Sequence, residues 1–222
     1  MKVNNFNTFI SKVLMWMCVG LVLTTLASLL VYKVKPLSEL ILGNNVIFFG
    51  LIILEILLVM IFKSKAEKMD SGSATLVFLV YSVVSGLTLS AIFFVYEIDS
   101  IVFVFLVASV MFGVMAMFGK FTKIDLQPLK VLLLMALCGV MLMLIVNMFI
   151  QSEGLALAIS YIGVLLFCVL TAYDMQKLKI LYEANNQDES RLNIIAINGA
   201  LSLYLDLINL FLFLLRILGK RK

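Results

Sequence analysis

Histidine is absent from the 222-residue sequence, and this absence removes several kinds of chemistry at once. Without an imidazole, the chain cannot form a Ser-His-Asp or Cys-His catalytic site, a histidine metal site or the usual side-chain switch near neutral pH. Any pH response must therefore come from carboxylates. The sequence also shows no Walker loop, no dinucleotide fingerprint after a strand and no obvious internal repeat.

Charged residues are scarce, since they make up 14% of the chain while hydrophobic residues make up 64%. A soluble domain is ordinarily about one quarter charged and half apolar, so the composition indicates an integral membrane protein. Apolar runs of about 20 residues recur along the chain, and each is long enough to cross about 30 Å of hydrocarbon as a helix. Such uninterrupted runs exclude a β-barrel, whose strands would alternate in polarity.

The sequence predicts an all-α integral membrane protein, a bundle of seven transmembrane helices in one domain over residues 1–222. The predicted spans cover residues 13–32, 46–62, 74–96, 101–118, 131–150, 155–173 and 196–218. Pro36 and Pro128 fall in connections, so no proline kinks a span. The three cysteines lie inside spans, and this odd number predicts no disulfide framework.

Lysine and arginine in the connections predict the orientation, because cytoplasmic loops carry the excess of these residues. The N-terminal segment and the second, fourth and sixth connections hold most of them. We therefore expect a cytoplasmic N-terminus, with a net charge of +4 that reflects basic loops and no nucleic-acid partner. Seven crossings place the basic tail GKRK outside, whereas a re-entrant last segment would return it to the cytoplasm; the last apolar run is long enough to span.

Two carboxylates interrupt or end the C-terminal apolar runs: Asp174 in FCVLTAYDMQ and Asp206 in SLYLDLIN. An ionised side chain in the hydrocarbon region costs several kcal/mol, so such residues ordinarily face a cavity or a partner. Asp174 ends the sixth predicted span, where an ordinary boundary charge is the alternative interpretation. Counted from the predicted helix starts, Asp206 lies deeper than Asp174 by up to roughly 13 Å. The sequence alone therefore does not force the two together.

Polar residues share one face of the last span when it is drawn as an ideal helix. They are Asn198, Ser202, Asp206, Asn209 and Arg216. Lipid is a poor neighbour for this face, so we expect the last helix in the bundle interior, with its polar face turned to other helices or to water. A hydrogen-bonded contact between helices, without transport, would also explain the pattern.

A third carboxylate, Glu55, lies near the middle of the second span. It indicates either part of an ion pathway or a protonated side chain that is hydrogen-bonded within the bundle. In the third span, Ser82, Gly86 and Ser90 recur at intervals of four, which permits close approach of helices. Asn147 in the fifth span indicates a hydrogen bond between helices more than a ligand.

Three stretches together resemble the Bax inhibitor family, also called the transmembrane Bax inhibitor motif family. They are YSVVSGLTLS in the third span, TAYD at the end of the sixth and ALSLYLDLINLFLFLLRILG in the last. The resemblance covers nearly the whole chain and is most specific in SLYLDLINLF with its C-terminal LLRILG. It implies a protein of a bacterial inner membrane that acts as a pH-sensitive calcium leak channel. The expected partners are membrane lipid and calcium ion, and no cofactor is required.

The resemblance also implies roles for individual residues. The paired aspartates of the family, near its cytoplasmic mouth, correspond to Asp174 and Asp206, and a glutamate implicated in ion passage in bacterial relatives matches Glu55. Some relatives latch the sixth-span aspartate with a basic residue at the cytoplasmic end of the second span. This chain offers no arginine there, and lysine lacks the planar fork for bidentate pairing, so the latch would be weaker or absent. The candidate latch residues are Lys63, Lys65 and Lys68.

A carboxylate pair that shares a hydrogen bond loses its first proton readily and holds the second, because like charges repel. With one shared proton, Asp174 and Asp206 would hold the sixth and seventh helices together, and loss of that proton would drive them apart. Ca²⁺ prefers several oxygen ligands, so it would bind the opened pair together with oxygens of Asn209 or Ser202 and water. We therefore expect protonation to favour the closed pore and deprotonation the open one.

Three other functions compete with this interpretation. A non-transporting regulator that binds a membrane protease complex or another membrane partner needs no continuous ion path. A proton-coupled cation exchanger would also use titrating carboxylates. An intramembrane aspartyl protease carries one aspartate on each of two helices, but glycines flank its second aspartate, whereas Leu203, Tyr204 and Leu205 precede Asp206 here. We therefore expect the protein not to be an enzyme.

Overall fold

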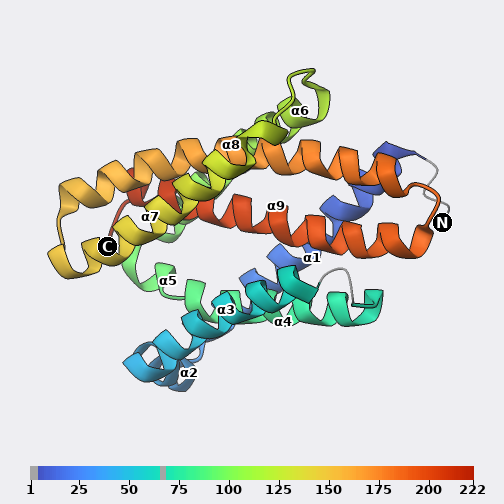
Figure 1. Ribbon diagram of the computed structural model, residues 1–222. Helices are drawn as coiled ribbons and strands as arrows, with labels where there is room; N and C mark the ends of the chain where they lie inside the picture. Colours follow the sequence, from blue (N-terminus) through green and yellow to red (C-terminus); the bar gives the residue numbers. More distant parts are fainter. Residues whose placement is uncertain (1–4, 66–68) are drawn as a thin grey trace. The chain divides into compact units, whose positions relative to one another are not determined.

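The structure, a computed structural model, describes residues 5–65 and 69–222 and is built from α-helices (Figure 1). Within these residues, seven helical segments are long and apolar enough to cross a membrane. The last of them, Glu189–Leu218, has the largest buried share. The predicted all-α class, the seven spans and the interior character of the last helix are thereby confirmed.

The helices follow one another with short connections. Their bounds are α1 Phe6–Lys33, α2 Lys35–Leu42, α3 Asn45–Lys65, α4 Ser71–Leu89, α5 Ile92–Val95, α6 Ile98–Phe121, the 3-10 helix η1 Gln127–Leu129, α7 Lys130–Ile150, α8 Glu153–Asn185 and α9 Glu189–Leu218. Two compact units divide the chain: Met1–Val95 with Leu181–Tyr204 and Lys222, and Tyr96–Ile180 with Leu205–Arg221. Both α8 and α9 pass from one unit into the other. The single domain stays a prediction.

The N-terminus of α4 is fixed by a carboxylate that precedes it. Asp70 accepts hydrogen bonds from the backbone N–H groups of Gly72 and Ser73 at 3.0 and 3.2 Å, which satisfies donors that a helix start leaves open. The Ser73 hydroxyl and these N–H groups hold the pKa of the exposed Asp70 carboxyl below its ordinary value. Because all three donors favour the ionised form, α4 begins more firmly when Asp70 is charged.

In the first unit, α1 and α4 approach closely through small residues. A methyl group added at Gly86 would lie 2.5 Å from the carbonyl oxygen of Thr24, as the four-residue spacing of small side chains predicts. The Thr24 hydroxyl donates to the carbonyl oxygen of Ser82, and the Ser28 hydroxyl donates to that of Gly86, both at 2.8 Å. Side-chain hydroxyls therefore link the two helices where their backbones are closest.

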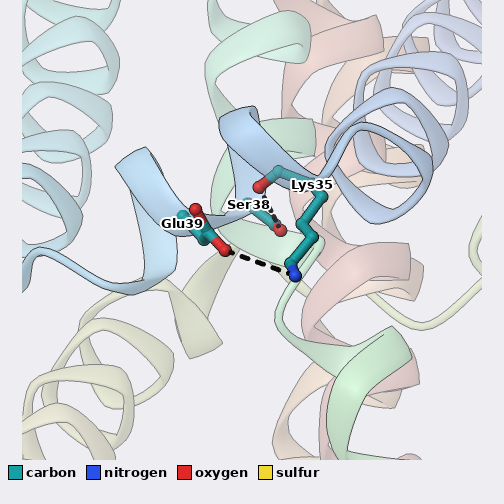
Figure 2. Close-up of polar contacts among 3 residues, drawn as sticks. All are labelled: Lys35, Ser38 and Glu39. Carbon is teal, nitrogen blue, oxygen red and sulfur yellow. Dashed lines mark hydrogen bonds and ion pairs between the residues drawn. The ribbon is translucent and has the colours of Figure 1, made fainter.

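The first connection contains a short helix, α2, that the sequence analysis did not predict. Pro36 lies in its first turn, where a missing N–H is tolerated. Figure 2 shows the Ser38 hydroxyl, which donates to the carbonyl oxygen of Lys35 at 2.9 Å, and the Lys35 ammonium, 3.9 Å from the Glu39 carboxylate. Both charged side chains are largely exposed, so this ion pair adds little to stability.

The N-terminal half of α1 also contacts the region where α8 ends and α9 begins. The rings of Phe6 and Phe9 lie 5.5 and 5.2 Å from that of Tyr182, measured between centroids. The Lys12 ammonium donates to the side-chain oxygen of Asn193 in the first turns of α9. These contacts hold the first turns of α1 against residues of the sixth connection.

In the second unit, close helix approach and a buried amide position α8. The backbone of Gly119 in α6 contacts that of Ala172 so closely that a side chain on the glycine would collide with it. The buried Gln176 accepts a hydrogen bond from the N–H of Leu126 and donates one to the carbonyl oxygen of Ile124, both at 2.8 Å. Gln176 thereby ties the connection between α6 and α7 to α8.

Several boundaries differ from the predicted spans, and the following differences bear on the site. The third predicted span, 74–96, breaks after α4, because Ser90 caps that helix before α5 begins at Ile92. The polar segment after residue 173 is almost entirely helical, and only residues 186–188 separate α8 from α9. Its Lys, Leu, Gln and Glu side chains are good helix formers, so the helix continues beyond the apolar run. Asp174 therefore lies inside α8, about three turns before its end, instead of ending the helix.

Candidate intramembrane carboxylate site

Asp206 lies in the middle of α9 and is buried. Only 4% of its surface is exposed, and the neighbouring Leu207 and Ile208 are buried as well. Burial of a charge without compensation is costly, and Asp206 is not without an interaction partner. Its position agrees with the prediction of a carboxylate in the interior of the protein.

Asp174 lies on α8 between the buried Tyr173 and Met175, and its own side chain is half-buried. It too has a polar or electrostatic interaction. Both aspartates belong to the second unit. Asp174 therefore lies within a continuous helix and between buried neighbours, while its position relative to the membrane boundary stays a prediction.

A ring contact sets the register between α8 and α9 in this unit. Phe167 and Phe213 have centroids 5.9 Å apart, and Gly163 leaves the room that Phe213 occupies, since an added methyl group would lie 2.6 Å from its ring. The three-residue connection makes α8 and α9 antiparallel, and they are the long orange and red helices of Figure 1.

The two aspartates stand in the same relation to this ring contact. Asp174 follows Phe167 by about two helical turns on α8, and Asp206 precedes Phe213 by about two turns on α9. Because α8 and α9 are antiparallel, the step from Phe167 to Asp174 and the step from Phe213 to Asp206 run in the same direction, each by about 10 Å. Seven residues are nearly two full turns, so each aspartate lies on nearly the same face of its helix as the phenylalanine. The depth difference that was expected from sequence therefore does not prevent the two aspartates from meeting. Each aspartate lies the same number of residues from the phenylalanine of its own helix, and the two phenylalanines are in contact. This register supports a pairing of Asp174 with Asp206, which stays a prediction.

The two supporting ligands have different surroundings. Asn209 is half-buried in the second unit, and its amide group donates to the carbonyl oxygen of Leu205 at 2.8 Å, so its side-chain oxygen is the atom that would bind a cation. Ser202 is half-buried in the first unit. Among the described residues, no group of three or more Asp, Glu, Cys or His side chains could hold a metal ion. A calcium site at the pair would therefore need backbone, amide or water oxygens.

Glu55 is half-buried on α3, and its carboxylate accepts a hydrogen bond from the Thr88 hydroxyl of α4. It also lies close enough to the hydroxyls of Tyr81 and Tyr204 to interact with them electrostatically. Glu55 is thus hydrogen-bonded to a neighbouring helix, while the protonated state that the alternative interpretation requires stays a prediction. The role of Glu55 in an ion pathway stays a prediction.

The latch prediction concerns residues that the structure does not describe fully. Lys68 lies outside the described residues, and so do the side chains of Lys63 and Lys65 at the end of α3.

Sequence reasoning missed a group of buried hydroxyls next to Glu55. The Tyr204 hydroxyl is 2.7 Å from that of Thr24 and 3.2 Å from that of Ser85. The only signal in the sequence was a polar residue in each of three apolar runs, which is common in spans that pack closely. Gln176 was missed for a different reason, because its partners are backbone groups.

Comparison with known proteins agrees with the motif-bearing stretches. The profile described as "Inhibitor of apoptosis-promoting Bax1" matches residues 6–222. The chain belongs to the Bax inhibitor family. Its relatives include the inner membrane protein YbhL of Escherichia coli, 44% identical over 97% of this chain and 92% of YbhL. An uncharacterized protein of Borreliella burgdorferi is 37% identical over 97% of this chain and 93% of its own length. An uncharacterized membrane protein of Streptococcus pyogenes is 36% identical over 96% of this chain and 93% of its own length.

Membership covers both units, because the match runs from the first residues of α1 to the end of the chain. The chain is therefore a multi-span membrane protein of this family, built from seven apolar helices within the described residues.

Proposed function

We propose that the protein is a calcium leak channel of an inner membrane, opened by deprotonation of the Asp174–Asp206 pair. The observation that supports this most is the register of α8 and α9. Phe167 contacts Phe213, and Asp174 and Asp206 each lie about two turns from that contact in the same direction. The burial of Asp206 adds to it, because a shielded carboxylate responds strongly to a second charge nearby.

The strength of the switch follows from Coulomb's law. Two unit charges 4 Å apart repel by on the order of 4 kcal/mol at an effective dielectric constant of 20. This energy corresponds to about three pH units, so a proton shared by two carboxylates persists toward neutral pH. When it leaves, repulsion separates α8 from α9, and Ca²⁺ binds between the opened carboxylates with the Asn209 oxygen and water. Glu55 continues the path through the middle of the membrane.

The orientation is part of this proposal. The basic connections place the N-terminus in the cytoplasm, and α9 is one continuous helix that is long enough to cross the membrane. Beyond it, the backbone N–H of Lys220 donates to the Ser100 hydroxyl, and its carbonyl oxygen accepts from the N–H of Glu97. Both partners lie at the third connection, which is outside in this orientation. These contacts support a C-terminus outside over a re-entrant last segment.

Calcium uptake into liposomes that contain the pure protein tests the proposal. We expect uptake that rises with pH in the wild type and loses its pH dependence in the double variant Asp174→Asn, Asp206→Asn. Glu55→Gln should reduce flux at every pH, whereas Glu153→Gln, at the exposed start of α8, should match the wild type. A pH profile unchanged in the double variant contradicts the proposal. Flux that follows an imposed proton gradient favours an exchanger, and no flux, with a protease complex recovered from native membranes, favours a regulator.

A further inference from the structure

Among the residues of the first unit that the structure describes, Tyr204 is the largest fully buried side chain. Its ring meets those of Phe78 and Tyr81 nearly edge-on, with centroids 6.1 and 5.8 Å away and interplanar angles of 90° and 85°. Edge-to-face contacts on two rings restrict both the position and the rotation of the tyrosine. The ring therefore locks this point of α9 against α4.

The Tyr204 hydroxyl extends this contact to a third helix. It lies 2.7 Å from the Thr24 hydroxyl of α1 and donates to the Ser85 hydroxyl of α4 at 3.2 Å. The Thr24 hydroxyl has one proton and three acceptors in reach, namely the carbonyl oxygens of Gly20 at 2.9 Å and Ser82 at 2.8 Å and the Tyr204 hydroxyl. A hydroxyl in the hydrocarbon region has no water to turn to, so rotation of α9 would leave the Tyr204 hydroxyl without its partners on α1 and α4.

One intramembrane carboxylate borders this hydroxyl cluster. Glu55 of α3 interacts electrostatically with Tyr81 and Tyr204, and Thr88 of α4 holds its carboxylate through a hydrogen bond. The titratable groups near the Tyr204 hydroxyl are therefore Glu55 and Tyr81, while α1 contributes the non-titrating Thr24. The protonation of Glu55 accordingly belongs among the variables that any test must control.

Tyr204 and Asp206 are two residues apart on one continuous helix. This step corresponds to a rise of about 3 Å and a rotation of about 200°, so the two side chains point to nearly opposite sides of α9. The boundary between the two units also falls between them, with Tyr204 in the first and Asp206 in the second. If the contacts of Tyr204 fix the rotation of α9 about its axis, they also fix the direction in which the Asp206 side chain points.

We propose that the Tyr204 hydroxyl is a positioning group that holds α9 in the rotation that keeps Asp206 buried, and thereby sets the pH at which the aspartate pair opens. The inference rests on the proposed function of that pair. The hydroxyl makes its hydrogen bonds in the conformation in which Asp206 is buried, so its loss would destabilise that conformation, and opening would need less repulsion between the carboxylates. The pair then opens at a lower pH.

The first test compares the pH profile of calcium flux in four variants made in the full-length protein. Tyr204→Phe and Thr24→Val should move the midpoint to lower pH by about half a unit, the scale of one hydrogen bond between membrane helices. Thr24→Ser keeps the hydroxyl and should restore the wild-type midpoint. Thr25→Val is the matched control, since exposed Thr25 donates only to Leu21 of its own helix at 2.8 Å. The flux series is repeated in Glu55→Gln to exclude an effect through that carboxylate.

A second readout does not depend on flux. Spin labels at exposed positions 177 of α8 and 191 of α9, in a background with the three cysteines replaced by serine, report the distance between these helices. Tyr204→Phe and Thr24→Val should broaden the distance distribution, and Thr25→Val should not. Should the wild type show no pH-dependent flux, the proposed function fails, while a broadened distribution still shows that Tyr204 fixes α9. Unchanged midpoints and unchanged distances in both variants overturn the inference.

Discussion

The close contact between α1 and α4 makes a quantitative prediction for Gly86→Ala. The added methyl group would lie 2.5 Å from the carbonyl oxygen of Thr24 and 2.7 Å from the methyl group of Ala27, whereas ordinary contact begins at 3.4 Å. The helices must therefore separate by about 0.9 Å. A shift of this size stretches the 2.8 Å bond from Ser28 to Gly86 beyond the normal range.

The cost of Gly86→Ala combines overpacking with weakened hydrogen bonds. Overpacking costs about 1 to 3 kcal/mol, and each hydrogen bond between membrane helices contributes about 0.6 kcal/mol. With the two hydrogen bonds between α1 and α4 weakened, we expect the free energy of unfolding to fall by about 2 to 4 kcal/mol, measured by denaturant titration in detergent with circular dichroism. Gly50→Ala is the control, because nothing lies within 4 Å of a methyl group there. Equal stability of the two variants would refute the close approach of α1 and α4.

Three further predictions concern contacts outside the carboxylate pair. The pKa of Asp70 is lowered from 3.8, so its stabilisation of the α4 start is complete above pH 3.8 and is lost as pH falls through the lowered pKa. Exchange of the amide hydrogen of Ser73 should therefore accelerate in that acidic range. Asp70→Ala should show no such step. Gln176→Leu should release the connection between α6 and α7, seen as faster hydrogen exchange in residues 122–129, while Lys177→Leu should leave it protected. Removal of residues 219–222 should accelerate exchange at Glu97, whose N–H donates to the carbonyl oxygen of Lys220, and protection equal to that of the full chain would argue against the docked tail.

Hydropathy was sufficient to predict the helices that cross the membrane, because an apolar run of about 20 residues has few other stable states in lipid. It could not predict where α8 ends, since the residues after Asp174 are polar but good helix formers, and a polar segment between two apolar runs is compatible with either a loop or a helix. The depth of Asp174 relative to Asp206 was uncertain for the same reason. Register depends on particular contacts such as that of Gly163 with Phe213, which periodicity does not encode.

In the candidate site too, some residues could be predicted from the sequence and others could not. Asp206 and Glu55 could be predicted because a carboxylate in an apolar run is conspicuous. The hydroxyls of Thr24, Ser85 and Tyr204 could not, because such residues are common in spans and acquire a role only through partners on other helices. Gln176 binds backbone groups of a distant connection, and nothing in its own neighbourhood of the sequence indicates this.

The proton shared by Asp174 and Asp206 is the central claim, and infrared titration of the protein in lipid tests it most directly. In a Glu55→Gln background, the account predicts one protonated-carboxyl absorption that disappears as pH rises through the range in which calcium flux begins. Asp174→Asn and Asp206→Asn should each abolish this near-neutral step, because a single carboxylate has no partner with which to share the proton. A step that persists in both variants, or is absent from the parent protein, would contradict the account.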